Sequence, residues 1–299
     1  MSIKKLFFLG LFSVIFAARL LACPCGCGAA RPLSLSAAET WKFRLELSRK
    51  YQEDLVDING ALAKDHGPQG IDTTVFGLAY AINNKLSLSG QWSVERNWHR
   101  LSSSDYSAGD PSFGMQYVLF SPDLDHFYFP TVNVHASYKH SISKGKNEQS
   151  ERPYLLDIHG NGVSEFVPGF SVWFAYASWS LGLSESLQLR RSYEFENEVA
   201  KETRQMGWGQ QRQVTLAYTF FGFGQILGIF SSEYKTEDQV NEVRQQGSSS
   251  QRQEIELVGN IRIGVQKSLG ISLKRSGFYL QNRNTSRNQT LGISYEQAI

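Results

Sequence analysis

The sequence predicts an all-β fold: a transmembrane antiparallel up-and-down β-barrel of about 12 strands, with both termini in the periplasm. Three observations support this prediction. Long segments alternate apolar and polar residues with period two, the connections between them alternate between long and short, and the first residues are typical of an export signal.

Residues 1–22 are typical of a signal peptide. Lys4 and Lys5 precede the apolar stretch LFFLGLFSVIFAA, which is too short to span a bilayer comfortably as a helix. Without this segment, which also contains Arg19, the 30 basic residues fall to 27 against 28 acidic ones, so the net charge is about −1. A nucleic-acid binding protein would show a basic excess, so no nucleic-acid partner is expected.

The expected regions are the signal peptide over 1–22, a Cys-containing periplasmic lead-in over 23–39, and an outer-membrane barrel over 40–299. The first predicted strand shows the pattern that defines the barrel. In TWKFRLELSRKYQ, apolar residues starting at Trp41 and Phe43 alternate with Lys42, Arg44 and Glu46. A strand sorts such residues onto two faces, whereas a helix does not.

The same pattern predicts strands that are longer than the roughly 5–6 residues usual in soluble proteins and suit the roughly 9–11 that cross a bilayer. They lie near 40–53, 71–83, 85–98, 111–121, 126–141, 165–178, 180–195, 210–221, 224–236, 251–266, 269–281 and 287–297. A secreted soluble sandwich is the alternative, because it also buries one sheet face and wets the other.

Connection lengths provide a second test of the barrel. The long, polar connections cover 54–70, 99–110, 142–164, 196–209 and 237–250, and the short ones lie around Asn84, SPDL, Trp179, FG and KSLG. Outer-membrane barrels have long loops outside and short turns in the periplasm. An even strand number also lets the sheet close without an open edge.

In such a barrel the apolar face contacts lipid and the polar face lines the lumen. The polar side chains of the inner face either form cross-strand pairs that fill the barrel or line a solute path. The expected lumen-lining residues are Lys42, Arg44, Glu46, Glu95, His135, Lys139, Gln188, Arg190, Glu194, Glu254, Glu256, Arg262 and Lys274.

His135 and Ser137 stand two apart on one predicted strand, as the His-x-Ser pair of outer-membrane phospholipase A does. The chain continues with Tyr138 and Lys139 where that family has Asn-Gly, and both side chains are expected to face the lumen, away from lipid. Because no orienting residue can be assigned, we expect no enzyme.

Three cysteines, Cys23, Cys25 and Cys27, are the only ones in the chain. Leu20-Leu21-Ala22-Cys23 has the spacing for lipid attachment at Cys23, although Arg19 disfavours it, and ordinary cleavage after Ala22 is the alternative. The thiolates suit Cu(I) or Zn but fall short of a closed site, and a disulfide is equally open. No other cofactor is expected.

Cysteine acylation is directly testable. If Cys23 is the lipid-attachment site, labelled palmitate is incorporated into the native chain and not into the Cys23→Ser variant. Equal labelling of the two chains contradicts acylation at this residue.

Several segments resemble a known family. GLAYAINNKLSLSGQW, GDPSFGMQYVLF and GVSEFVPGFSVWFAYASWSLGLSESLQLRRSYEF, with Gly109-Asp110 and the 162–196 hairpin most recognisable, resemble outer-membrane transporters linked to the phenol meta-degradation pathway. The likeness covers roughly residues 75–297. It implies passive uptake of small hydrophobic or aromatic compounds and carries over no binding residues.

We therefore expect a passive channel in the outer membrane of a Gram-negative bacterium. The expected partners are outer-membrane lipid, a small-molecule solute and the barrel assembly machinery. Two alternatives stay open: a structural or surface-display barrel with a sealed lumen, and a metal-handling protein that uses the cysteine segment.

Overall fold

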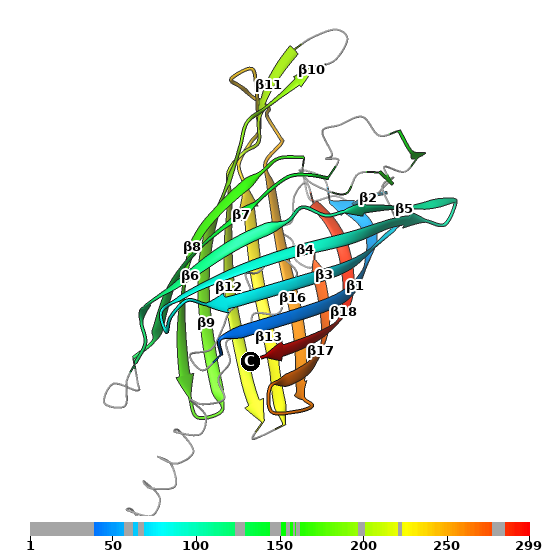
Figure 1. Ribbon diagram of the computed structural model, residues 1–299. Coiled ribbons are helices and arrows are strands. Elements are labelled where there is room, and N and C mark those ends of the chain that lie inside the picture. The colour runs from blue at the N-terminus through cyan, green and yellow to red at the C-terminus, as the bar shows by residue number, and fades with distance from the viewer. Residues whose placement is uncertain are drawn as a thin grey trace, which may run out of the picture.

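A closed antiparallel barrel forms the body of the protein (Figure 1). The computed structural model describes residues 39–56, 62–64, 69–122, 129–143, 151–153, 156–157, 159, 162–196, 201–220, 223–276 and 285–299. The predicted signal peptide and residues 23–38 of the lead-in lie outside them. Within the described ranges, no helix is long and apolar enough to cross a membrane.

Twelve described strands form the wall. They are β1 (Trp41–Val56), β3 (Gly70–Ala81), β4 (Leu86–His99), β6 (Ser112–Phe120), β7 (Thr131–Lys139), β8 (Glu165–Tyr176), β9 (Trp179–Arg190), β12 (Gly209–Phe220), β13 (Gly224–Lys235), β16 (Ser250–Arg262), β17 (Lys267–Ser276) and β18 (Thr285–Ala298). Each overlaps one predicted strand, so the predicted all-β antiparallel barrel of about 12 strands is confirmed.

The barrel closes where its first and last strands meet. β18 pairs antiparallel with β1 over a register that runs from Lys42 opposite Ala298 to Val56 opposite Thr285. The backbone N–H of Trp41 donates to the carbonyl oxygen of Ile299 at 3.0 Å. Because each wall strand therefore has two neighbours, the described wall has no open edge in the hydrocarbon region.

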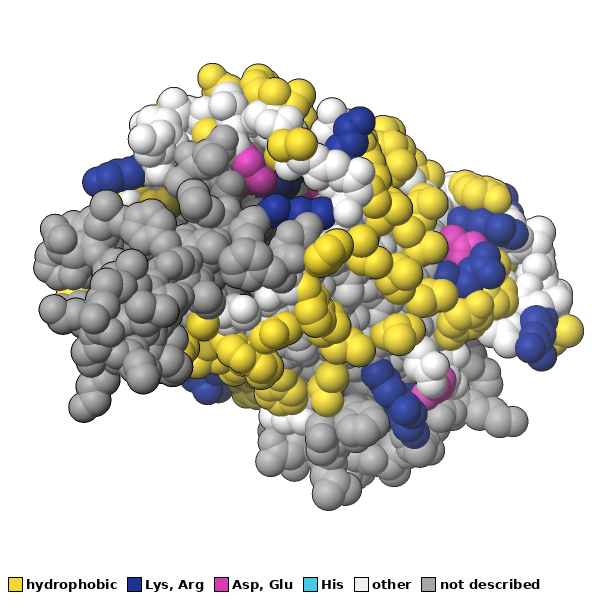
Figure 2. All heavy atoms as spheres, turned by 90° about the horizontal axis from the view of Figure 1, so that it is seen from below, with side chains coloured by type: hydrophobic (Ala, Val, Ile, Leu, Met, Phe, Trp, Pro, Cys, Tyr) yellow, Lys and Arg dark blue, Asp and Glu magenta, His cyan; other side chains and the backbone are white. Residues whose placement is uncertain are grey.

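The two faces of the wall have opposite chemistry. On β1, Phe43 and Leu47 are exposed on the outside, whereas Lys42 and Arg44 are each only 3% exposed on the inside. This inverts the usual soluble pattern, in which apolar side chains are the buried ones. Seen from the end with the short turns, hydrophobic side chains form a broad band along the described wall (Figure 2).

Connections at the two ends differ in length. At one end, β8 and β9 are joined through Ala177 and Ser178, and the turn before β4 is held by Asn83, whose side-chain oxygen accepts from the N–H groups of Lys85 and Leu86. β1 begins and β18 ends at this same end. The connection after β6 is longer than expected, because β7 begins at Thr131 rather than near residue 126.

The opposite end carries additional strands. β2 (Leu62–Lys64) pairs antiparallel with the end of β1, and β5 (Ser102–Ala108) pairs with β4. β10 (Tyr193–Glu196), β11 (Lys201–Gln205), β14 (Gln239–Val240) and β15 (Val243–Arg244) form a separate four-stranded sheet, of which β10 and β11 rise above the barrel in Figure 1.

Adjacent residues of β6 test which face meets lipid. Met115 is exposed on the outer face, and Gln116, opposite His135, points inward. We expect Met115→Arg to destabilise the barrel in vesicles by about 2–4 kcal/mol, the cost of placing a cation in the lipid-facing wall near the midplane. Gln116→Arg is the matched control and should cost much less. Urea unfolding in lipid vesicles measures both, and equal destabilisation would reverse the assignment of the faces.

Candidate lumen wall

The inward face of β1 forms ion pairs near the short-turn end. Arg44 lies directly opposite Glu296 of β18, and its Nε donates to a carboxylate oxygen of Glu296 at 2.8 Å. Lys42 Nζ lies 3.0 Å from Glu39, which precedes the strand. Because a buried charge is costly without a partner, the two pairs explain how these cations are kept on the inner face.

A belt of alternating charge begins on the neighbouring strands. Lys274 Nζ of β17 lies 2.6 Å from Glu254 of β16, and Arg252 pairs with the same carboxylate. Lys50 of β1 interacts electrostatically both with Glu254 and with Glu95 of β4. The inner wall is therefore connected electrostatically from β16 across β1 to β4.

Asp110, between β5 and β6, extends the belt to the next strands. Its Oδ2 lies 3.3 Å from Lys139 Nζ of β7, and its Oδ1 accepts from the backbone N–H of Ile142 and of Ser143, both at 3.0 Å. The Ser143 hydroxyl also donates to Oδ1, at 2.6 Å. One carboxylate thus joins the wall to the connection that follows β7.

Asp110 keeps its charge despite its buried position. Burial by itself raises the pKa of this carboxyl, but the hydrogen bonds from Ser143 and Ile142, together with Lys139, hold the pKa below its ordinary value. Gly109 beside it has no room for a side chain, because a Cβ would lie 2.0 Å from Ser93 Oγ. The Gly109-Asp110 pair therefore has a structural role at the rim.

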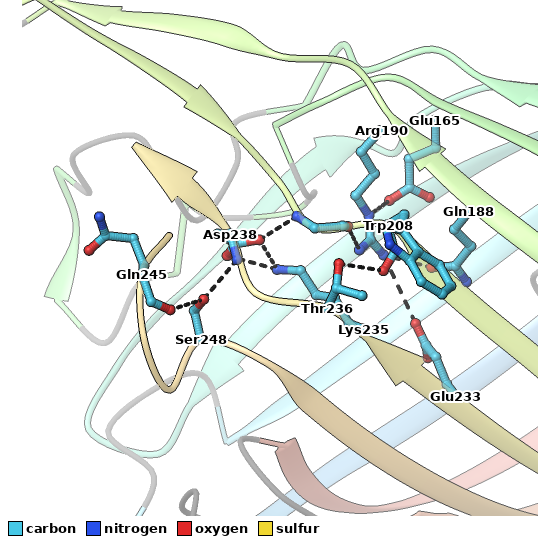
Figure 3. Close-up of polar contacts among 11 residues, drawn as sticks. Glu165, Gln188, Arg190, Trp208, Glu233, Lys235, Thr236, Asp238, Gln245 and Ser248 are labelled. Carbon is cyan, nitrogen blue, oxygen red and sulfur yellow. Dashed lines mark hydrogen bonds and ion pairs between the residues drawn. The ribbon is translucent and has the colours of Figure 1, made fainter. Parts of the chain in front are cut away.

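A third polar cluster lies at the base of the small sheet (Figure 3). Arg190 of β9 is buried; its Nε donates to Glu165 of β8 at 2.7 Å, and its two terminal nitrogens donate to Gln188 and to the carbonyl oxygen of Gly207. The N–H of Gly207 donates to Asp238 at 2.6 Å. The cluster therefore ties the barrel rim to the connections that carry β11 and β14.

Apolar side chains also occupy part of the inner face. Leu227 and Ile229 of β13 are 1% and 2% exposed, whereas their neighbours Ile226 and Phe230 are exposed on the outside. With Ala217 and Val258 from the flanking strands they form one buried cluster, which we call the inner apolar patch. The signal in the sequence was the run ILGIF, where apolar residues occur on both parities of the strand.

The structure places most of the expected lumen residues on the inner face. Glu194 is a correction: β9 ends at Arg190, the backbone of Tyr193–Glu196 pairs with β11 instead of a wall strand, and Glu194 therefore lies outside the barrel wall. Arg262, the last residue of β16, is exposed at the short-turn end rather than enclosed. The residues on inward-facing positions are Lys42, Arg44, Glu46, Glu95, His135, Lys139, Gln188, Arg190, Glu254, Glu256 and Lys274.

His135 packs closely against the neighbouring strand. A Cβ at Gly169 of β8 would lie 2.5 Å from His135 Nε2, so the glycine makes room for the ring. Among the residues that the structure describes, no group of three or more His, Cys, Asp or Glu is arranged to hold a metal ion. Cys23, Cys25 and Cys27 lie outside those residues.

Comparisons with known proteins agree on the fold. No family model and no curated protein matches the sequence. The structure resembles the crystal structure of an outer membrane channel from Pseudomonas putida F1, with a TM-score of 0.68 and 10% sequence identity over 91% of this chain and 99% of that one. It also resembles the NanC porin, with a TM-score of 0.52 and 11% identity over 85% of this chain and 100% of that one.

The closed wall, its apolar outer face and these likenesses define an outer-membrane β-barrel. The relatives share the fold with this chain, and at such low identity they say nothing of its solute. The solute of this barrel has to be inferred from the residues on its own inner face.

Removal of the Asp110 charge should loosen the rim. We expect Asp110→Asn to speed backbone hydrogen exchange at Ile142 and Ser143 by about tenfold, because their N–H groups lose a charged acceptor. In the native chain the same amides should lose protection only as the pH falls below the ordinary range of an aspartate, because the pKa of Asp110 is lowered. A carboxylate with a lowered pKa stabilises the fold above its unfolded-state pKa, and that contribution is lost as the pH falls through the folded-state pKa.

The matched control is Asp238→Asn, which removes a carboxylate from a different connection. It should leave exchange at Ile142 and Ser143 unchanged. If both variants behave alike at these amides, Asp110 does not hold the segment.

Proposed function

We propose that the protein is a passive channel of a Gram-negative outer membrane for a small solute with a hydrophobic or aromatic part. In this proposal the long loops face outward, and the short turns and both termini face the periplasm. The apolar outer face and the charged inner face support insertion in a bilayer. Twelve strands lie between small barrels filled by side chains and larger aqueous porins.

The inner apolar patch is the observation that carries the choice of solute. Leu227, Ile229 and Val258 occupy inward-facing positions of a barrel whose other described inner positions are largely polar. Each is at most 2% exposed, so a solute would reach them by displacing the groups that cover them. Sites for small organic ligands combine apolar walls with a few placed polar groups. The family resemblance of residues 75–297 points to the same solute class.

The alternating charges of the inner wall argue against a strong preference for either cations or anions. Lys274 and Arg252 offset Glu254, and Lys139 offsets Asp110, so opposite charges alternate along the wall. Paired charges produce little net field in the lumen. We therefore expect the channel to select solutes by shape and polarity more than by charge sign.

Transport can be measured with the purified chain in two ways. Discrete openings are expected in planar bilayers, and vesicles that contain the protein should take up a small phenol-like aromatic compound faster than empty vesicles. Ile229→Asn should slow this protein-dependent uptake by roughly fivefold, because it replaces part of the inner apolar patch with an amide.

The matched control is Ser231→Asn, which places the same side chain on the next inward-facing position of β13. It should leave aromatic uptake close to the native rate, and both variants should pass small ions as the native chain does. Equal effects of the two substitutions would contradict a role for the inner apolar patch. A native chain without discrete openings would instead favour the sealed, structural barrel.

A further inference from the structure

Four arginines lie on the outer face of neighbouring strands, toward the long-loop end of the barrel. Arg49 and Arg96 are 50% and 40% exposed, on β1 and β4, and Arg275 and Arg287 occupy outward-facing positions on β17 and β18. Arg96, Arg275 and Arg287 lie within a few residues of the strand ends at the long-loop end of the barrel, and Arg49 lies opposite Asp72, near the same end of β3 (Gly70–Ala81). We call these four residues the outer arginine cluster.

The other end of these four strands, and of β3 between β1 and β4, is chemically different. Apolar or aromatic side chains occupy the corresponding outward-facing positions, and the cations near that edge include Lys267, the first residue of β17, and Lys85, just before β4. These positions are Trp41, Tyr80, Leu88, Leu269 and Tyr295. The outer face of this sector therefore meets two different headgroup layers with two different chemistries.

Carboxylates offset only part of the positive charge in the cluster. Asp72 of β3 lies between two arginines: it accepts from Arg49 at 2.6 and 3.0 Å and lies 3.8 Å from Arg96. Arg287 Nε lies 3.9 Å from Glu53. Arg49 and Arg96 share the single carboxylate of Asp72, so this pair keeps a formal charge of about +1 on an outward-facing surface. A guanidinium also has more N–H donors than one shared carboxylate can accept.

Aromatic rings contact two of the arginines. Arg49 Cζ lies 5.9 Å from the centre of the Trp98 ring, and Arg96 Cζ lies 5.5 Å from that of Tyr106. Trp98 is held flat on the wall, because a Cβ at Gly70 would lie 2.4 Å from its ring, and Tyr51 packs edge-on against it. Such rings are typical of headgroup depth in membrane barrels, so we expect the guanidinium groups of Arg49 and Arg96 at the depth of lipid phosphates.

We infer that the outer arginine cluster binds the phosphate groups of the phosphorylated glycolipid, lipid A, in the outer leaflet. Guanidinium groups recognise phosphate oxygens through paired hydrogen bonds, and Asp72 holds two of them in place before the lipid binds. The inference rests on the proposed orientation, in which the long-loop end lies in the outer leaflet.

The test compares two lipids and three proteins. The purified full chain is titrated with bis-phosphorylated lipid A and with the same lipid after removal of its phosphates. The native chain should bind the phosphorylated form at least about tenfold more tightly. The Arg49→Gln/Arg96→Gln double variant should lose that preference, whereas Arg212→Gln, which removes an outward-facing arginine paired with Glu185 on another sector, should keep it.

Equal affinity of the native chain for the two lipids would overturn the inference, and this comparison decides even if the double variant fails to fold. Unchanged preference in a folded double variant would overturn it as well. The conductance of the native chain in lipid A-free bilayers is measured in parallel. A chain that conducts without distinguishing the lipids contradicts the lipid site alone, and one that distinguishes the lipids without conducting contradicts the channel alone.

Discussion

The pairing of β1 with β18 is the interaction on which the rest of the structure depends. Inside a bilayer, no water is present to satisfy backbone N–H and C=O groups, so an open strand edge carries a large energetic cost. The register from Lys42 opposite Ala298 to Val56 opposite Thr285 removes that edge. An even number of antiparallel strands and a common end for both chain termini follow from closure.

Closure also decides what each side chain meets. Successive residues of a strand point to opposite faces, so a wall with lipid outside must gather its polar residues inside. Charges there are retained through partners on neighbouring strands, as Arg44 with Glu296 and Lys274 with Glu254 show. The inner apolar patch departs from this rule, and it is the part of the wall most suited to an apolar solute.

The two ends of the barrel differ in structure. Short turns and aromatic side chains finish one end, where Trp41 and Tyr80 pack together. The other end carries a small sheet anchored through Arg190 and Asp238, and the segment after β7 held by Asp110. The polar contacts at this end hold loops against the rim, while the outer arginines face the membrane.

The sequence by itself determined the number of strands, their face-by-face chemistry and the alternation of long and short connections, because these depend on local period and on turn residues. Only the tertiary structure decided which groups meet. Arg44 and Glu296 are 252 positions apart, and their contact exists because closure sets the register. Glu194 fits the polar–apolar alternation of its predicted strand, but it lies outside the wall because its backbone pairs with β11. Leu227 and Ile229 are apolar residues on inward-facing positions of β13. The run ILGIF is apolar on both faces, so the period-two pattern alone does not say which of its residues face inward.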